Sequence, residues 1–504
     1  MAPRTLPDLL TGRQGPALGA PGRPGLDHPG VLAVIDRLGA QLAGLGLGPG
    51  DGVALVLPNG PEAAAAFLGV ASHATAAPLN PAYTEEEFAF YLEDLGATRL
   101  ILAEGVETPA RAAAARLGIP VSTLIAGNAA GDVALDNDAT APARRNGPDD
   151  EALVLHTSGT TSRPKIVPLS AANICVSAEH IAQSLSLSPA DRCLNVMPLF
   201  HIHGLIAAVL AALSAGGSVT CTPGFDALKF FAWLREIRPS WYTAVPTMHQ
   251  AILTRAKRNA EIVAEAPLRL IRSSSAALPM PVLEALEETF GCPVIEAYGM
   301  TEAAHQMAAN PLPPAARKPG TVGLAAGPQV AVMDAGGALL PSGAVGELVI
   351  RGPNVTPGYR NNPKANAENF TDGWFRTGDQ GEIDPEGYIT IRGRLKEIIN
   401  RGGEKISPRE VDDVLIAHPE VAQVVTFAMP HRMLGEDVAA AVVLEEGAAT
   451  DARALRAFAA ERLAPFKVPA RIEILAEIPK GATGKLQRIG LAEKLGIAKP
   501  EHGA

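Results

Sequence analysis

The stretch His156-Thr-Ser-Gly-Thr-Thr-Ser-Arg-Pro-Lys165 is the most informative part of this chain. It is a run of small and hydroxylated residues that ends in a lysine, and it directly follows Ala-Leu-Val-Leu (152–155), which is typical of a buried strand. A flexible backbone with short side chains can wrap closely around a polyphosphate, because amide N–H groups and hydroxyls then act as donors. The spacing differs from the G-x-x-x-x-G-K-[ST] nucleotide loop, and a polar surface turn is the alternative interpretation.

Length and composition limit the class of protein. A chain of 504 residues is too long for one hydrophobic core, so we expect two or more domains. The apolar fraction of 47% and the charged fraction of 19% are typical of well-packed globular domains. With 43 Lys and Arg residues against 53 Asp and Glu residues, the formal net charge of −10 argues against non-specific binding to nucleic acid.

The cysteines and the two ends of the sequence give information about the cellular compartment. Cys175, Cys193, Cys221 and Cys292 lie far apart with no C-x-x-C pair, so the sequence predicts neither a zinc site nor a disulfide framework. Prolines and charges interrupt the N-terminal residues before an apolar run of signal-peptide length forms, and no window of about 18 apolar residues predicts a membrane span. The C-terminal Glu-His-Gly-Ala is not a peroxisomal address. We therefore predict a cytoplasmic protein.

Strands alternate with helices through much of the chain, which predicts a mostly parallel, doubly wound sheet. Residues 127–150 lack periodicity and predict a surface connection, with a domain boundary as the weaker alternative. His201 and His203 are one residue apart in a segment expected to be extended, so they would point to opposite faces, which argues against a chelating metal pair. The expected helices are 30–45, 61–73, 84–95, 173–187, 205–215 and 226–237, and the expected strands are 52–57, 98–102, 193–198, 218–222 and 241–245.

Two further strand ends carry small polar residues. Residues 268–271 run into Arg-Ser-Ser-Ser-Ala (272–276), and residues 293–296 run into Ala-Tyr-Gly-Met-Thr-Glu (297–302). Open α/β sheets bind their ligands at the carboxyl ends of the strands. We therefore expect a ligand site at these two ends.

From about residue 329 the sequence changes to short β segments separated by Gly, Pro and Asp-Gly turns, which predicts a β-rich subdomain. Asp379 is expected there in a tight turn, and the charged run 392–405 predicts a hinge near Arg394–Lys396. We thus predict an N-terminal domain 1–394 and a C-terminal cap 395–504. The cap is expected to contain helices 408–417 and 451–463, strands 420–428, 437–444 and 470–475, and a second glycine-lysine loop, PKGATGK (479–485).

Five motifs in order resemble the adenylate-forming superfamily of acyl-CoA synthetases, luciferases and peptide-synthetase adenylation domains. They are TSGTTSRPK (157–165), YGMTE (298–302), TGD (377–379), GRLKEIINRGGEKISP (393–408) and PKGATGK (479–485). The resemblance covers the chain from about residue 30 and implies a large α/β region with doubly wound sheets and a β-rich subdomain, followed by a small mobile α+β domain. It also implies that ATP and Mg²⁺ convert a carboxylic acid to an acyl-adenylate, which the thiol of coenzyme A then attacks.

The same resemblance implies roles for particular residues. Joining a carboxylate to an α-phosphate brings two anions together, so the site must supply cations and amide donors. Lys485 resembles the lysine that bridges the acid and the α-phosphate, and Thr301 and Glu302 resemble catalytic phosphate and Mg²⁺ ligands. The other expected contacts are Thr157, Ser158, Gly159, Thr160, Thr161 and Lys165 at the phosphates, with Thr160 also at Mg²⁺; Ser274, Ser275, Ala276, Ala297 and Tyr298 at the adenine; Asp379 at the ribose and Arg394 at the ribose or a phosphate; and Lys396, Gly402, Gly403 and Lys405 at the hinge and the coenzyme A side.

Departures from the superfamily pattern narrow the substrate. Ser162 and Ile166 stand where the usual loop has glycine, and TSGTTSRPK, HQMAANPLP (305–313) and NRGGEKISP (400–408) are similar to oxalate-CoA ligases, the peroxisomal-coenzyme-A-synthetase-like branch. Malonate-CoA ligases carry arginine where Ala297 stands, which argues against malonate. By resemblance to 4-coumarate-CoA ligases the acyl site is lined by polar residues that suit a short, doubly charged acid better than an apolar ring: His203, His305, Gln306 and Ser274.

The sequence thus predicts an acid-thiol ligase that converts oxalate to oxalyl-CoA with release of AMP and pyrophosphate, and His305 is expected to bind the carboxylate that does not react. Its partners are small molecules, and the sequence does not indicate the oligomeric state. Three alternatives remain open: a ligase for another short or medium acid, an adenylation enzyme that loads a carrier protein, and a catalytically inactive adenylate sensor. The aromatic content of 4% argues against luciferase-like oxygenation, which needs apolar walls.

Overall fold

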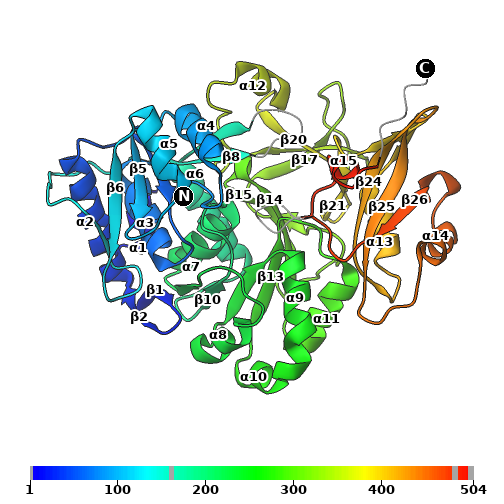
Figure 1. The fold of residues 1–504 in the computed structure, drawn as a ribbon, viewed down its shortest axis with the longest axis horizontal. Helices are drawn as coiled ribbons and strands as arrows, with labels where there is room; N and C mark the ends of the chain where they lie inside the picture. Colours follow the sequence, from blue (N-terminus) through cyan, green and yellow to red (C-terminus); the bar gives the residue numbers. More distant parts are fainter. Residues whose placement is uncertain (1–3, 158–163, 480–485, 498–504) are drawn as a thin grey trace. The chain divides into compact units, whose positions relative to one another are not determined.

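The computed structural model describes residues 4–157, 164–479 and 486–497 (Figure 1). The chain forms two compact units. The first comprises Met1–Leu278, Glu284–Gln329 and Ile350–Phe375, and the second comprises Pro279–Leu283, Val330–Val349 and Arg376–Ala504. The predicted domain boundary at 394/395 lies inside the second unit and stays a prediction.

The first unit contains a seven-stranded sheet with the order β7-β6-β5-β3-β4-β8-β9. Strands β6, β5, β3, β4 and β8 run parallel, and β7 and β9 pair antiparallel at the two edges. The central strands are almost continuously apolar because helices cover both faces of the sheet. The strands are β3 (Gly52–Val56), β4 (Thr75–Pro78), β5 (Arg99–Ala103), β6 (Val121–Ala126), β7 (Val133–Leu135), β8 (Glu151–Thr157) and β9 (Lys165–Ser170).

Two pairs of helices cover this sheet (Figure 1). On one face, α4 (Glu85–Leu95) and α5 (Pro109–Leu117) pack Phe88 and Ala113 against Val56 and Leu100 of the strands. On the other face, α2 (His28–Gly44) and α3 (Pro61–His73) pack together. The helix termini follow from the sequence, because the Asp27 side chain accepts from the Gly30 N–H and Thr84 forms a capping box with Glu87.

The short strand β7 corrects one prediction. Residues 127–150 were predicted to be a surface connection, but Val133–Leu135 pairs antiparallel with β6 and buries Val133 and Leu135. Three residues are too few to show a strand period, so this edge strand has no recognisable sequence pattern. No other helix or strand lies in this range, all of which the structure describes.

A nine-stranded sheet has the order β16-β15-β14-β13-β12-β10-β11-β1-β2. Strands β14, β13, β12, β10, β11 and β1 are parallel, and β15, β16 and β2 complete the sheet antiparallel. The two sheets confirm the predicted doubly wound α/β class. The strands are β1 (Pro16–Ala20), β2 (Arg23–Asp27), β10 (Arg192–Asn195), β11 (Ser218–Cys221), β12 (Trp241–Ala244), β13 (Leu270–Ser274), β14 (Val294–Met300), β15 (His305–Ala309) and β16 (Leu324–Ala325).

The segment of His201 and His203 is helical, so the prediction of an extended segment was wrong. A π-helix, η1 (His203–Leu210), begins there and continues as α7 (Ala211–Ser214), and the Leu205 N–H already donates to the His201 carbonyl. The long apolar run that follows is buried on all sides, which favours a core helix over a strand. The other helices near the nine strands in the sequence are α1 (Leu6–Leu10), α6 (Ala171–Ser184), α8 (Phe230–Ile237), α9 (Pro246–Ala256), η2 (Lys257–Asn259), α10 (Ala260–Glu265) and α11 (Met280–Phe290).

The predicted β-rich subdomain is a five-stranded sheet in which β17-β18-β20-β19 are neighbours and β21 pairs with β20. Asp379 was expected in a tight turn but lies inside the long strand β20, so that prediction was wrong. Gly378 with φ 75 and a register shift after Gln380 bend this strand, and the Thr-Gly-Asp sequence therefore marks an irregularity within a strand. The elements are β17 (Gln329–Met333), β18 (Gly346–Arg351), α12 (Pro363–Asn369), β19 (Phe370–Thr371), β20 (Trp374–Ile383) and β21 (Ile389–Arg394).

The C-terminal residues of the second unit form the expected α+β arrangement. Its sheet has the order β23-β22-β25-β24, and β26 pairs parallel with β25. Val411 and Leu415 of one helix and Leu455 of another pack on Val438 and Val442 of the sheet. The elements are β22 (Ile399–Arg401), β23 (Glu404–Ile406), α13 (Pro408–Leu415), β24 (Val421–His431), β25 (Gly435–Leu444), α14 (Ala452–Ala460), η4 (Pro465–Lys467), β26 (Arg471–Ile474) and α15 (Leu491–Lys494).

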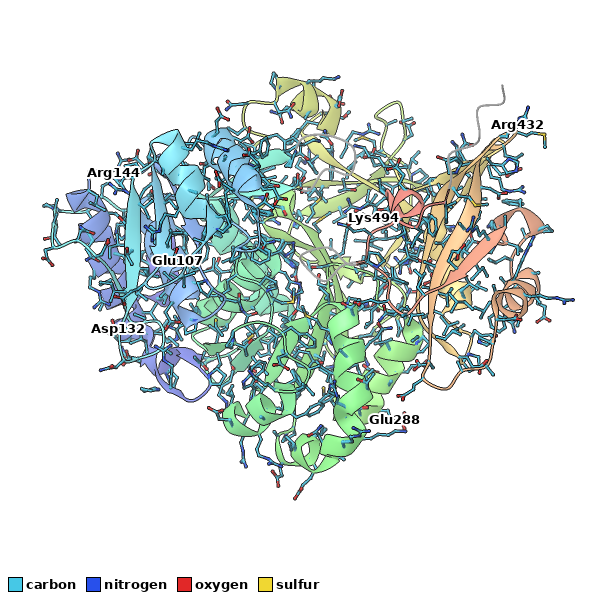
Figure 2. All side chains as sticks on the ribbon, in the orientation of Figure 1. Glu107, Asp132, Arg144, Glu288, Arg432 and Lys494 are labelled. Carbon is cyan, nitrogen blue, oxygen red and sulfur yellow. The ribbon has the colours of Figure 1, made fainter. Side chains whose placement is uncertain are left out.

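Charged side chains such as Glu107, Arg144 and Glu288 are exposed (Figure 2). Among the residues that the structure describes, no helix combines the length and apolar character needed to cross a bilayer.

The buried His249 of α9 predicts acid sensitivity. Its Nδ1 lies 3.1 Å from the Tyr242 hydroxyl, and burial lowers the pKa of His249 to about 3. In the unfolded chain the pKa is about 6.5, so the unfolded state binds the extra proton as the pH falls below that value. Between pH 6 and pH 4 this group should lower the free energy of unfolding by about 1.4 kcal/mol per pH unit.

We expect His249→Gln to reduce this slope, measured as the urea midpoint at several pH values. Tyr242→Phe is the matched control, because it removes the hydroxyl partner but keeps the buried imidazole and should keep the slope. Equal slopes for wild type and His249→Gln would contradict the assignment.

Candidate active site

Residues that were predicted to contact the adenine of ATP lie together at the ends of β13 and β14. Ser274 pairs with Ala297 across the two strands, and the Ser274 hydroxyl donates to the Ala297 carbonyl at 2.8 Å. Tyr298 follows Ala297 and is buried. Ser275 leaves the strand with φ 75, a left-handed conformation that is rare for serine and frequent at functional sites.

His203, at the start of the π-helix η1, points to the same strand ends. Its Nδ1 lies 3.0 Å from the Ser275 hydroxyl, and its Nε2 lies 2.6 Å from the hydroxyl of Thr243 on β12. The His203 and His305 rings meet edge to face with centroids 5.0 Å apart. The structure thus assembles three predicted residues, His203, Ser275 and His305, from separate parts of the sequence.

Gln306 follows His305 on β15, and successive side chains of a strand point to opposite faces. The Gln306 amide donates to the Ser184 hydroxyl at 3.0 Å and to the Ala326 carbonyl at 3.1 Å, and its oxygen accepts from Arg272 at 3.2 Å. The Gln306 side chain is therefore part of a buried hydrogen-bond network. The predicted contact of Gln306 with the acid stays a prediction.

Arg272 is a fully buried cation in this network. Among the described residues it has no ion pair with a carboxylate, and its Nε has no hydrogen-bond partner. Burial lowers the pKa of Arg272 to about 9, so the side chain is still positively charged at neutral pH. A buried charge without a counter-charge is costly, which makes this position unusual for a core strand.

Glu302 lies in the short helix η3 (Thr301–Ala303) directly after β14. Its carboxylate accepts from the Tyr359 hydroxyl at 2.8 Å, and Lys165 Nζ lies 4.4 Å from the centroid of the Tyr359 ring. Tyr359 thus connects two predicted residues, the lysine of the phosphate loop and the carboxylate expected to bind Mg²⁺. Thr157 and Lys165 face each other on β8 and β9, at the two ends of the predicted loop.

Five predicted residues lie outside the part of the chain that the structure describes: Ser158, Gly159, Thr160, Thr161 and Lys485. Among the described residues, no three His, Cys, Asp or Glu side chains form a metal-binding group. Mg²⁺ needs no such group, because it binds through one or two carboxylates together with substrate phosphates and water. Glu302 therefore fits Mg²⁺ bound together with a nucleotide.

In the second unit, Asp379 and Arg394 pair directly across β20 and β21. Arg394 Nε lies 3.2 Å from Asp379 Oδ1, and the Asp379 side chain is only 4% exposed whereas that of Arg394 is 54% exposed. The Thr377 hydroxyl accepts from the Asp379 N–H at 3.0 Å and donates to the Leu348 carbonyl. The buried carboxylate thus pairs with a cation whose side chain is more than half exposed.

The residues predicted at the hinge and the coenzyme A side lie nearby in the sequence. Lys396 is in the turn after β21, and Gly402 and Gly403 form the β22–β23 turn with φ 60 and 101. The Gly402 N–H donates to the Leu434 carbonyl at 2.9 Å, and Lys405 pairs with Asn400 on the facing strand. Their roles at the hinge and the coenzyme A side stay predictions.

Three residues of the site were missed or given no role from sequence: Thr243, Arg272 and Tyr359. Thr243 lies inside an apolar strand, where a polar residue was not separable from the core pattern. Arg272 begins the polar stretch 272–276, but that stretch does not indicate its buried partners on other elements. Tyr359 is 57 residues from Glu302 in the chain, and no spacing links the two.

Comparison with known proteins identifies the class. Residues 30–360 match the model of the AMP-binding enzyme family, and residues 410–485 match the AMP-binding enzyme C-terminal domain. The chain therefore belongs to the AMP-binding enzyme family, and the predicted adenylate-forming, acyl-CoA synthetase class is confirmed.

Individual relatives are similar to this chain over most of its length. The chain is 46% identical over 496 residues to the oxalate-CoA ligase of Arabidopsis thaliana, with 96% of each chain covered. It is 43% identical over 473 residues to the oxalate-CoA ligase of Saccharomyces cerevisiae, covering 88% of this chain and 86% of that protein. Among solved structures, ATP-bound MatB from Rhodopseudomonas palustris matches with a TM-score of 0.88 and 30% identity, covering 97% of this chain and 98% of that one.

Gly299 controls the position of His305, which predicts a specific intolerance. A Cβ at Gly299 would lie 1.7 Å from the His305 carbonyl oxygen, so the β14–β15 pairing cannot accept even a methyl group without moving. We expect Gly299→Ala to lower the free energy of unfolding by about 1–3 kcal/mol or more, the usual range for overpacking. Differential scanning fluorimetry measures this as a fall in the thermal midpoint.

Gly48→Ala is the matched control, because a Cβ at Gly48 meets nothing within 4 Å. It should change the free energy of unfolding by no more than about 0.5 kcal/mol. A thermal midpoint of Gly299→Ala equal to that of Gly48→Ala would contradict the close approach.

Proposed function

We propose that this chain converts oxalate, ATP and coenzyme A to oxalyl-CoA, AMP and pyrophosphate. The observation that carries the proposal is the cluster of His203, His305 and Ser275 at the strand ends, with the uncompensated cation of Arg272 behind it. A small dianion satisfies such a polar, electropositive cluster, whereas an apolar acid would desolvate it without replacement. The two relatives named oxalate-CoA ligase support the same substrate.

The reaction has two balanced steps. First, a carboxylate oxygen of the acid bonds to the α-phosphorus of ATP, and the bond to pyrophosphate breaks. Second, the sulfur of coenzyme A bonds to the acyl carbon, AMP leaves, and the thiol proton is released. Both steps develop charge at the phosphate and carboxylate oxygens, so fixed donors and cations lower the barriers.

We assign the phosphates to Thr157, Lys165 and Thr301, and to the loop residues Ser158, Gly159, Thr160 and Thr161. Tyr359 supports this assignment, because it lies against Lys165 and donates to Glu302. Mg²⁺, held by Glu302 and Thr160, would neutralise phosphate charge during adenylation. Ser274, Ala276, Ala297, Tyr298 and the Ser275 backbone form the adenine wall.

The remaining proposed roles fall on residues 379–485. Asp379, buried and oriented by its backbone, accepts from the ribose hydroxyls, and Arg394 contacts the ribose or phosphate. Lys485 bridges the two anions during adenylation, and Lys396 lies at the hinge of a cap that begins at residue 395. Gly402, Gly403 and Lys405 face coenzyme A. The four cysteines are free and buried, which supports a reducing, cytoplasmic location.

The substrate is tested with the wild-type chain and a panel of acids. With ATP, Mg²⁺ and coenzyme A, we expect kcat/KM for oxalate to exceed that for acetate and malonate by about tenfold or more, the effect of about 1.4 kcal/mol. AMP and pyrophosphate release are measured together with thioester formation. Release of AMP and pyrophosphate without a preference for oxalate would overturn the substrate assignment. Release that requires a carrier protein in place of coenzyme A would favour the carrier-loading alternative.

The role of Lys485 is tested by separating the two steps. We expect Lys485→Ala to lower adenylation by about 100-fold or more, since the lysine is needed when two anions meet, while attack of coenzyme A on a supplied acyl-adenylate changes little. Lys494→Ala is the control, because Lys494 (labelled in Figure 2) is exposed on α15 and its side chain bonds only to Gln487 among the described residues. An equal loss in both steps would contradict the assignment.

A further inference from the structure

The core of the first unit contains a chain of hydrogen bonds whose direction can be worked out. It begins at Arg272 on β13, which is fully buried and is adjacent to Thr243 on β12 in the sheet register. Arg272 Nη1 lies 3.5 Å from the Thr243 hydroxyl oxygen, and Nη2 donates to the Gln306 oxygen at 3.2 Å. A guanidinium has only donors, so the Thr243 oxygen can only accept from Arg272.

The next step is the proton of Thr243. This hydroxyl is fully buried, and its two hydrogen-bonding neighbours among the described residues are Arg272 Nη1 and His203 Nε2 at 2.6 Å. Since the guanidinium cannot accept, His203 Nε2 is the acceptor for the Thr243 proton. The opposite arrangement would leave a buried hydroxyl proton without an acceptor, which folded proteins avoid.

The tautomer of His203 follows. A neutral imidazole carries one proton, and with Nε2 accepting from Thr243 that proton is on Nδ1. Nδ1 therefore donates to the Ser275 oxygen at 3.0 Å. A doubly protonated ring would bring a second positive charge next to the buried Arg272, which has no carboxylate partner among the described residues.

The last member of the chain is the Ser275 hydroxyl. Its oxygen accepts from His203, so its own proton is available to a further acceptor. Ser275 is partly exposed and has a left-handed backbone (φ 75), and its hydroxyl lies beside the His203 ring, which in turn meets the His305 ring. Bonds that all point the same way polarise one another, and here they lead from a buried cation to an accessible donor.

We propose that Arg272 and Thr243 are positioning residues that hold the Ser275 hydroxyl as a donor to the carboxylate of the acid that does not react. Ser275 then determines specificity through its side chain, in addition to its backbone place beside the adenine. The proposal rests on the proposed function, because it assigns the second carboxylate of a small dianionic acid to a particular donor. With the opposite tautomer, Ser275 would present lone pairs and repel that carboxylate.

The direction of the chain is tested without any substrate. Long-range ¹H–¹⁵N correlation spectra of the full protein labelled at the histidine nitrogens distinguish the two tautomers, and His203→Gln identifies the signals of His203. We expect the Nδ1–H tautomer in the wild type and a population of the Nε2–H tautomer in Thr243→Val. An Nε2–H tautomer in the wild type would overturn the proposal.

The effect on specificity is tested by kinetics. We expect Ser275→Ala and Thr243→Val each to raise KM for oxalate by about 10- to 150-fold, the range for one hydrogen bond to a charged group, with KM for ATP changed by less than about twofold. Because Thr243 acts through Ser275, the double variant should resemble Ser275→Ala alone. Arg272→Lys, which keeps a charge with donors only, should retain more oxalate affinity than Arg272→Met.

Thr222→Val is the matched control, since the Thr222 hydroxyl is also fully buried and donates to the Asn195 and Gly224 carbonyls. It should lower the thermal midpoint as Thr243→Val does and leave KM for oxalate unchanged. Multiplicative losses in the double variant, or equal losses for oxalate and ATP, would overturn the relay. Absence of oxalate turnover in the wild type would instead overturn the proposed function, and the tautomer measurement would still decide the direction of the hydrogen bonds.

Discussion

The in-register pairing of four parallel strands is the constraint on which the site of the first unit depends. Strands β10, β12, β13 and β14 are hydrogen-bonded neighbours, so their carboxyl ends share one edge about 4.8 Å apart from strand to strand. Thr243, Ser274 and Ala297 lie at or near these ends, and the chain after β10 returns to place His203 beside them. Backbone hydrogen bonding sets these distances independently of the side chains. The chemistry of the edge therefore depends on which residues end each strand.

Much of the fold could be predicted because its elements follow strong periodic patterns. The long helices α2 and α3 and the strands β3 and β5 lie within one or two residues of their predicted ranges, because apolar residues at helical or strand spacing leave little choice. The errors occur where local sequence is ambiguous. The strand β7 is too short to show a period, and Asp379 follows a glycine that bends a strand where a turn was expected.

The candidate site could be predicted where its residues lie in short contiguous stretches of sequence. Ser274, Glu302, Asp379 and Arg394 stand in such stretches, and the structure places each at a strand end or in a strand pair. Thr243, Arg272 and Tyr359 could not be found this way, because their partners are set by strand register and chain return over long separations. The sequence does not show which groups a buried threonine or arginine will contact, and only the three-dimensional neighbours fix the direction of its hydrogen bonds.

The π-helix that begins at His203 has a consequence for how such a site changes over time. A π-helical turn corresponds to an α-helical turn with one residue added, and it persists only while the surrounding core accommodates the extra residue. Loss of a single codon within His203–Leu210 would let the segment relax toward an α-helix and rotate the histidine about the helix axis, while the strands on either side kept their pairing. Insertion or deletion at this one turn would therefore reposition His203 relative to the strand ends while it leaves the sheet unchanged.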